Sequence, residues 1–524
     1  MSTEQDKAPA ARPDVVPENV RRLPPAALPA VLLAGFFFAV LVYKVWQHGL
    51  YFPYWDGLLL APFVDKAHEG TLGFLDLWSQ HNEHRPLFPR IIMLALALPT
   101  RWNVAWFLAV NVLAGLGTFV VLAYQLLALG RHARQAWWAL PVLAFFVFSW
   151  AQMENWIWGL ELTVLLCTFA VCAGIVSLAG RGGGWWRFAG GVALGVVASY
   201  SFANGLLYWF AALPVVIAAP ELDRKRRWLR VELWIVAAFL AIQAYLFQYQ
   251  KPGTSPSLAA VLDAPLSYLG YIVLYLGSPV TAVFARPPWH GGAQHALEWW
   301  HFLPGALGIA ACLVVLILLW RARRARFADA APWLSVAAFA VGSAMVTGVG
   351  RVGFGVAEAL NSRYITTNTL FWCGLVGLAA LLWATRSSSE QHRKRPRRGW
   401  VAALLGAALL LVFEGLTLHQ NQSWEQNARW KNMGWEAIRA GHEARLYLTD
   451  LCWDPALLRD EFLPILKRLE LCGFGAGGAP PPPAEPYLAE ARAFFAAQMW
   501  FPALTYLDTT LHLAPGHPEA RQLR

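Results

Sequence analysis

Charge is scarce in this sequence. Only 14% of its 524 residues are Asp, Glu, Lys or Arg, whereas 57% are hydrophobic. A soluble chain of this length would hold two to four domains. The mean hydropathy of +0.42 and the repeated apolar runs, each long enough to cross a bilayer, favour an all-α polytopic membrane protein instead.

Nucleic-acid binding is disfavoured despite the net charge of +10. The basic residues do not form one patch but short blocks between apolar runs, as in cytoplasmic loops under the positive-inside rule. These blocks are residues 131–134, 224–227, 321–326 and 393–398.

A small-residue cleavage site is also missing after the first apolar run, so we expect that run to be retained in the membrane. Residues 1–26 are polar and proline-rich, which is typical of a disordered cytoplasmic tail.

The apolar runs predict about 11 transmembrane helices, within a range of 10–13. The stretch 266–285 is treated as re-entrant or as two short interfacial helices, because Gly277-Ser278-Pro279 should break a helix. A crossing there would also place the block 321–326 outside. The N-terminus is then cytoplasmic and the C-terminus extracytoplasmic. The predicted spans are 27–46, 104–128, 136–150, 161–179, 187–203, 205–220, 231–249, 303–320, 331–349, 365–384 and 399–418.

Two further segments follow the predicted membrane domain, residues 27–420. Residues 421–485 are mixed polar sequence with a proline-rich linker, and residues 486–524 resemble one tetratricopeptide-type helical hairpin that would need neighbouring helices or a protein partner to cover it. Four of the six cysteines fall in apolar runs and are expected to be buried packing residues. Cys452 and Cys472 lie in the polar part, where a disulfide and two free thiols are both open.

The predicted outer loops carry nearly all the unusual polar residues. Asp56 ends the aromatic run "YFPYWD" just after the first span. It is either an incidental carboxylate in an interfacial aromatic belt or a general base at the mouth of an outward cavity.

The segment "WSQHNEHRPLFPR", residues 78–90, is the densest cluster of ionisable groups. His81 and His84 would share a face on a helix, but the spacing is not HExxH and a third ligand is missing, so a divalent metal stays possible without support. The guanidinium groups of Arg85 and Arg90 could bind a phosphate. Alternatively, the polar residues of this segment form a network that fixes the loop. Glu83 competes with Asp56 for the role of base. The other candidate binding residues of this segment are Asn82, Arg85 and Arg90.

Three more outer loops add candidates. Glu154 and Asn155 lie beside tryptophans, including Trp158, in an arrangement that suits a carbohydrate pocket or an ordinary interfacial loop. Asn204 belongs to a tight turn and is either structural or functional. A late loop holds the cations and phenol expected at an anion site, namely Arg351, Arg363 and Tyr364.

Four features together resemble the GT-C class of membrane glycosyltransferases. They are the many-span architecture, the large first outer loop with an Asp soon after the first helix, the Arg-Tyr pair opening a late span and the polar C-terminal region expected outside. That class includes protein O-mannosyltransferases and the bacterial aminoarabinose and arabinosyl transferases. The combination of the segments "HNEHR", "ENxxWG", "SFANG" and "SRY" is also similar to a group of uncharacterised bacterial multi-pass proteins associated with the class.

The resemblance implies an enzyme of the bacterial inner membrane. Its donor would be a sugar on a polyprenyl phosphate, and its acceptor an envelope glycan, lipid or protein. Asp56 would orient or deprotonate the acceptor hydroxyl, and Arg85, Arg351 and Arg363 would hold the lipid phosphate. No cofactor is required by this mechanism. The sequence departs from the class in two places. Many members have a paired acidic motif, whereas "YWDG" has a single acid, and the "HNEHR" segment has no counterpart in the mannosyltransferases.

Two other functions remain open at this point. A transporter or flippase for lipid-linked sugars would be expected to show internal repeats and charges inside its spans. No repeat is evident in the sequence, and the predicted spans carry few charges. A non-catalytic envelope assembly protein would act through the C-terminal hairpin.

Overall fold

The computed structural model describes residues 27–128, 136–180, 184–219, 222–253, 259–285, 297–322, 327–387, 396–475 and 480–524. The predicted cytoplasmic tail, the basic block 131–134, residues 323–326 of the block 321–326 and residues 393–395 of the block 393–398 lie outside these ranges. Regular structure in the described residues is helical apart from one isolated β-bridge. The prediction of an all-α chain is confirmed.

Within the described ranges, nine helices are long and apolar enough to cross a membrane. Eight of them coincide with predicted spans, and the ninth covers the stretch 266–285. The chain is therefore a polytopic membrane protein by helix length and composition. The nine helices are α1 (Ala27–His48), α5 (Ala105–Leu127), α8 (Leu162–Ala179), α12 (Arg224–Leu246), α14 (Pro265–Phe284), α15 (Leu303–Ala322), α16 (Phe327–Arg351), α17 (Ser362–Ser387) and α18 (Pro396–Gln420).

The other three predicted spans are shorter than expected. The run 136–150 forms α6 (Ala139–Val147), and the run 187–203 forms α9 (Trp185–Ser199). The run 205–220 is divided into α10 (Tyr208–Ala211) and α11 (Leu213–Ile217), with Pro214 in the first turn of α11. A proline fits the first turn of a helix but not its interior, which accounts for the division.

Helix α14 corrects the expectation of a break. It runs unbroken through Pro279. Proline has no N–H for the carbonyl four residues earlier, that of Tyr275, but the Ser278 hydroxyl donates to that carbonyl at 2.9 Å. The Asn368 amide donates in turn to Ser278 Oγ at 2.6 Å. The orphaned carbonyl is therefore satisfied inside the bundle.

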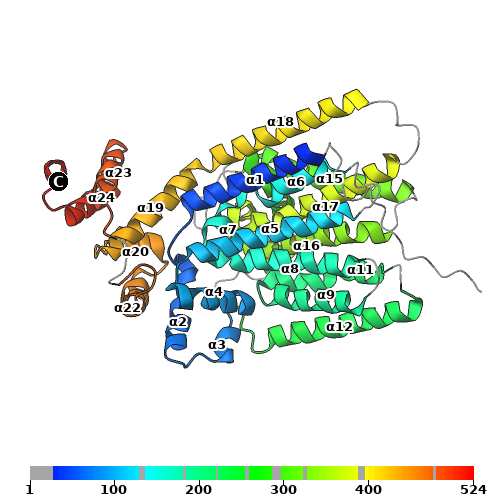
Figure 1. Cartoon of the computed structure of the whole chain (residues 1–524), viewed down its shortest axis with the longest axis horizontal. Helices are drawn as coiled ribbons and strands as arrows, with labels where there is room; N and C mark the ends of the chain where they lie inside the picture. Colours follow the sequence, from blue (N-terminus) through cyan, green and yellow to red (C-terminus); the bar gives the residue numbers. More distant parts are fainter. Residues whose placement is uncertain are drawn as a thin grey trace, which may run out of the picture.

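Both ends of α14 contact the same end of the helix bundle. We call this the loop end: it holds the segment after α1, the loop between α16 and α17, and the end of α18, at the left of Figure 1. Near the start of α14, the Tyr268 hydroxyl donates to the carbonyl of Met345, late in α16. At its finish, the Phe284 carbonyl accepts from Gln420, the last residue of α18. α14 therefore lies obliquely across the loop end.

Burial separates central helices from peripheral ones. In α17, 89% of the candidate span is buried, against 11% in α18. The exposed side chains of α18 are large and apolar, as are those on α1, α12 and α15. Continuous apolar exposure of this kind suits contact with lipid.

The segment after α1 folds into η2 (Trp55–Leu60), α2 (Ala61–His68) and α3 (Phe74–Trp78), followed by α4 (Leu87–Thr100). The C-terminal region, residues 421–524, lies at the same end (Figure 1). It consists of α19 (Gln422–Arg439), α20 (Arg445–Leu451), α21 (Pro455–Leu457), a π-helical turn (Leu458–Phe462), α22 (Leu463–Arg468), α23 (Glu485–Ala496), α24 (Trp500–Leu513) and α25 (Pro518–Leu523).

Ion pairs dock the C-terminal region on the bundle. Arg468 of α22 pairs with Asp65 of α2 at 2.5 Å. Glu425 of α19 accepts from Lys44 at 2.7 Å and from Trp150 Nε1 at 2.9 Å. These contacts join segments more than 270 residues apart in the sequence.

Helices α23 and α24 form a hairpin at the place where one was expected, and it packs on α19 and α20. The Tyr487 hydroxyl donates to the Met433 carbonyl at 2.7 Å, and the Tyr447 and Thr509 hydroxyls lie 2.6 Å apart. Neighbouring helices of the same chain thus cover the hairpin.

All six cysteines are free, including the pair left open by the sequence. The Cys472 thiol contacts the Trp102 carbonyl at 3.5 Å, and Cys472 N donates to the Arg101 carbonyl. Cys472 therefore ties the C-terminal region to the turn after α4 instead of forming a disulfide with Cys452.

Candidate functional site

The "HNEH" segment forms a tight turn and not a helix. The backbone N–H groups of His81 and His84 each donate to the other residue's carbonyl at 2.8 Å. Asn82 has φ +48°, a left-handed conformation that asparagine tolerates better than most residues. The two histidines consequently meet different partners, and the shared helical face considered for a metal site does not exist.

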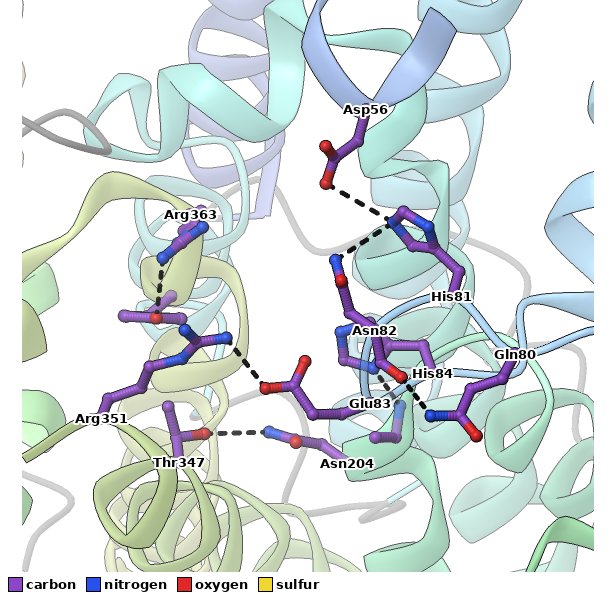
Figure 2. Close-up of polar contacts among 12 residues, drawn as sticks. Asp56, Gln80, His81, Asn82, Glu83, His84, Asn204, Thr347, Arg351 and Arg363 are labelled. Carbon is purple, nitrogen blue, oxygen red and sulfur yellow. Dashed lines mark hydrogen bonds and ion pairs between the residues drawn. The ribbon is translucent and has the colours of Figure 1, made fainter. Parts of the chain in front are cut away.

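Asp56 faces the first of these histidines. Its Oδ2 lies 3.5 Å from His81 Nε2, and the two side chains are 27% and 19% exposed. Asp56 follows Trp55, whose φ of +52° is uncommon for a bulky residue and marks local strain. The carboxylate is thus half-buried, held beside an imidazole and still accessible (Figure 2).

Glu83, the competing candidate for the base, is paired with a cation. Arg351 Nη2 lies 3.2 Å from Glu83 Oε1, with both side chains a little over a quarter exposed. Figure 2 shows Glu83 pointing toward Arg351, away from His81 and Asp56. Glu83 is therefore engaged in an ion pair with Arg351, whereas Asp56 lies beside His81 and is about as accessible.

His84 is a neutral residue that positions the neighbouring loop. Its ring stacks on Phe202 with centroids 4.2 Å apart, and its Nδ1 accepts from Ala203 N at 3.1 Å. Burial lowers the pKa of His84 to about 4, although the Glu83 carboxylate opposes the shift. The same loop places Asn204, whose amide donates to Thr347 Oγ1 at 3.3 Å (Figure 2).

Arg85 and Arg90 act on the backbone and not on a ligand. The three nitrogens of the Arg85 guanidinium donate to the carbonyls of Tyr245, Trp78 and Phe247. One nitrogen of Arg90 donates to the carbonyls of Leu77 and Ser79. Both side chains are buried. They fix the loop between α3 and α4, and we therefore leave them out of the phosphate site.

Arg363 keeps donor capacity for a ligand. Its Nη2 donates to the Tyr364 hydroxyl at 3.1 Å, while its buried Nε has no hydrogen-bond partner. Asn155, which is fully buried, donates to the Arg363 carbonyl at 2.9 Å and to Thr366 Oγ1 at 2.6 Å. The start of α17 is thereby fixed to α7 (Met153–Ile157).

Glu154 is the most unusual carboxyl group outside the candidate spans. It is 0% exposed, and neither of its carboxylate oxygens has a hydrogen-bond partner of normal geometry among the described residues. Burial raises the pKa of Glu154 to about 7, with the charge and the backbone N–H of Arg363 opposing the shift. Near neutral pH this side chain exists in both protonation states.

A cavity of about 190 Å³ lies between the bundle and the C-terminal region. From the bundle side it is lined by Glu154, Tyr54, Trp55 and Trp158, and from the C-terminal region by Lys431 of α19 and by Thr449 and Asp450 of α20. Of the candidate residues Asp56, His84, Glu154 and Arg363, Glu154 alone is among the described residues that line this cavity. The other three residues lie close enough to interact through their charges. The positive charge of Arg363 interacts with His84 and with Glu154, and Asp56 and Arg363 both interact with Glu161.

The sequence interpretation missed Lys431. The side chain is buried, and its ammonium lies 5.3 Å from the centre of the Tyr54 ring. Burial lowers the pKa of Lys431. A signal was present: Ala428, Lys431, Trp435 and Ile438 follow one another at helical spacing and are all buried. A lysine inside such an apolar stripe is a candidate for function.

Within the described ranges no group of three or more His, Cys, Asp or Glu side chains is arranged to hold a metal ion. Comparison of the chain with protein-family models, with curated proteins and with solved structures finds no match.

Proposed function

We propose that this protein is a glycosyltransferase that moves a sugar from a polyprenyl-phosphate donor to a cell-envelope acceptor at the loop end of the bundle. One observation carries the proposal: a half-buried carboxylate, Asp56, from the segment after α1 lies near two arginines, Arg351 and Arg363, that flank the loop between α16 and α17 (Figure 2). The resemblance to GT-C enzymes supports the same reaction.

Each group has a role in the reaction. Asp56 accepts the proton of the acceptor hydroxyl while the acceptor oxygen bonds to the anomeric carbon. The bond between that carbon and the phosphate oxygen breaks, and the polyprenyl phosphate leaves with the electron pair. The guanidinium groups of Arg351 and Arg363 stabilise the negative charge that develops on the leaving phosphate.

The surroundings suit a lipid-linked donor. The large apolar side chains on the exposed faces of α1, α12, α15 and α18 suit a bilayer. A prenyl chain lying in that bilayer would bring its phosphate to the loop end, where the arginines lie. We propose the bacterial inner membrane as the location, with the loop end extracytoplasmic.

The test is sugar transfer by purified protein from a panel of radiolabelled polyprenyl-phosphate sugars. Asp56→Asn is expected to lower kcat by roughly 10²–10⁴-fold, the usual contribution of a general base. Asp76→Asn is the matched control, because Asp76 belongs to the same segment and pairs with Lys66 at the surface. If no donor is turned over, or if Asp56→Asn is as active as Asp76→Asn, the proposal fails.

A further inference from the structure

The cavity between the bundle and the C-terminal region has rigid aromatic walls. Trp158 Nε1 donates to the Tyr54 carbonyl at 2.8 Å, and the two rings meet edge to face with centroids 5.4 Å apart. Trp55, the third aromatic residue, lies next to Trp453 of the C-terminal region. Fixed rings lose little conformational entropy when a ligand stacks on them.

The polar groups of the cavity favour a neutral ligand. Glu154 lies in the wall with two buried oxygens that lack hydrogen-bond partners, a state that costs roughly 1–3 kcal/mol per unsatisfied group. Lys431 is the one cation of the lining, against two carboxyl groups, those of Glu154 and Asp450. Such a balance suits hydroxyl groups and disfavours a phosphate, which the arginines near Asp56 would bind instead.

Size and access narrow the class of ligand further. About 190 Å³ is less than the roughly 300–1,000 Å³ of pockets for drug-sized ligands, so the space suits a single ring. Thr449 and Asp450 are exposed on α20. A ligand can therefore reach the cavity from the aqueous side, where an envelope acceptor would arrive.

We infer that this cavity binds the terminal sugar ring of the acceptor, stacked against Tyr54 and Trp158 and hydrogen-bonded through its hydroxyls to Glu154. The C-terminal region completes the site with Lys431, Thr449 and Asp450. The assignment of the ring to an acceptor rests on the proposed glycosyl transfer, whereas the binding of a neutral sugar does not.

The test measures binding without turnover. Purified full-length protein in detergent is titrated with the methyl glycosides of glucose, mannose, galactose and arabinose, and saturation transfer from protein to ligand is recorded by NMR. At least one glycoside is expected to bind the wild type. Glu154→Gln is expected to weaken its binding at least fivefold. Thr449→Trp should do the same by filling the cavity from an exposed position that leaves the bundle intact.

Thr505→Trp is the matched control, because Thr505 lies on α24 and does not line the cavity. It should bind the glycoside like the wild type. The inference is overturned if none of the four glycosides binds the wild type, or if Thr449→Trp binds as tightly as Thr505→Trp.

Sugar transfer measured on the same variants separates the two proposals. In one outcome, the wild type binds a glycoside, Thr449→Trp does not bind it, and the wild type turns over no lipid donor. That result supports the sugar site and refutes the proposed reaction. Transfer by Thr449→Trp at the wild-type rate and acceptor KM refutes the acceptor assignment and leaves the proposed reaction standing.

Discussion

Glu154→Gln should change how the stability of this protein depends on pH. The folded-state pKa of Glu154 is about 7 against an ordinary value of 4.5, a difference of about 2.5 units. At 1.36 kcal/mol per unit, keeping this carboxylate ionised in the folded protein costs about 3 kcal/mol. Because the pKa of the acid is raised on folding, the cost is absent below pH 4.5, grows between pH 4.5 and 7 and is complete above pH 7.

Glutamine keeps the size of the side chain and stays neutral at every pH. The stability difference between Glu154→Gln and wild type should therefore move in favour of the variant by about 2.5 kcal/mol from pH 5 to pH 8, since part of the cost is already present at pH 5. The loss of particular contacts adds a constant offset that does not vary with pH. Thermal unfolding in detergent reports the change as a relative shift of a few °C, because each kcal/mol moves Tm by about 2–4 °C in chains of 150–250 residues and by less in this chain of 524 residues.

Glu69→Gln supplies the control, because Glu69 is exposed in the segment after α1 and does not line the cavity. Its melting curve should follow that of the wild type across the pH series. Parallel Tm profiles for Glu154→Gln and wild type would show that Glu154 does not titrate in this range, and the reasoning from burial would be refuted.

The remaining predictions concern activity and packing. Glu83→Gln should keep kcat within a few-fold of wild type while Asp56→Asn loses it, and the opposite ranking in the transfer assay would make Glu83 the base. Arg85→Ala should lower stability by about 3 kcal/mol because three charged hydrogen bonds to carbonyls are lost; the donor KM of any folded protein should be unchanged, and a raised KM would return Arg85 to the phosphate site. Ser278→Ala should cost about 1–3 kcal/mol by leaving the Tyr275 carbonyl unsatisfied beside Pro279, and a thermal shift below 1 °C would contradict the account of α14.

Much of the fold could be predicted because long apolar runs have few alternatives in a membrane protein. The run 27–46 shows this, since it forms α1 with nearly the same limits. Hydropathy failed where helix length depends on backbone detail. It did not show that Pro214 divides one run, or that the Ser278 hydroxyl lets α14 continue through Pro279.

The candidate site was predicted residue by residue but not as an arrangement. Asp56 was found because it ends an aromatic run just after the first span, and Glu154 because it lies beside tryptophans as in a carbohydrate pocket. The sequence did not show that all three nitrogens of the Arg85 guanidinium would donate to backbone carbonyls, because two of those carbonyls belong to residues more than 150 positions away. Long-range hydrogen bonds of this kind leave no local pattern.

Because Lys431 of the C-terminal region lines the cavity, truncation of that region does not distinguish an enzyme from an assembly protein. Removal of everything after residue 420 would have indicated a recruiting role if the C-terminal region were only a docking module. Because that region supplies Lys431, Thr449 and Asp450 to the cavity, an enzyme would also lose function on truncation. A single substitution at the cavity mouth separates the two. Thr449→Trp should abolish function in an enzyme while the C-terminal region stays docked through Arg468 and Asp65, whereas an assembly protein should tolerate it.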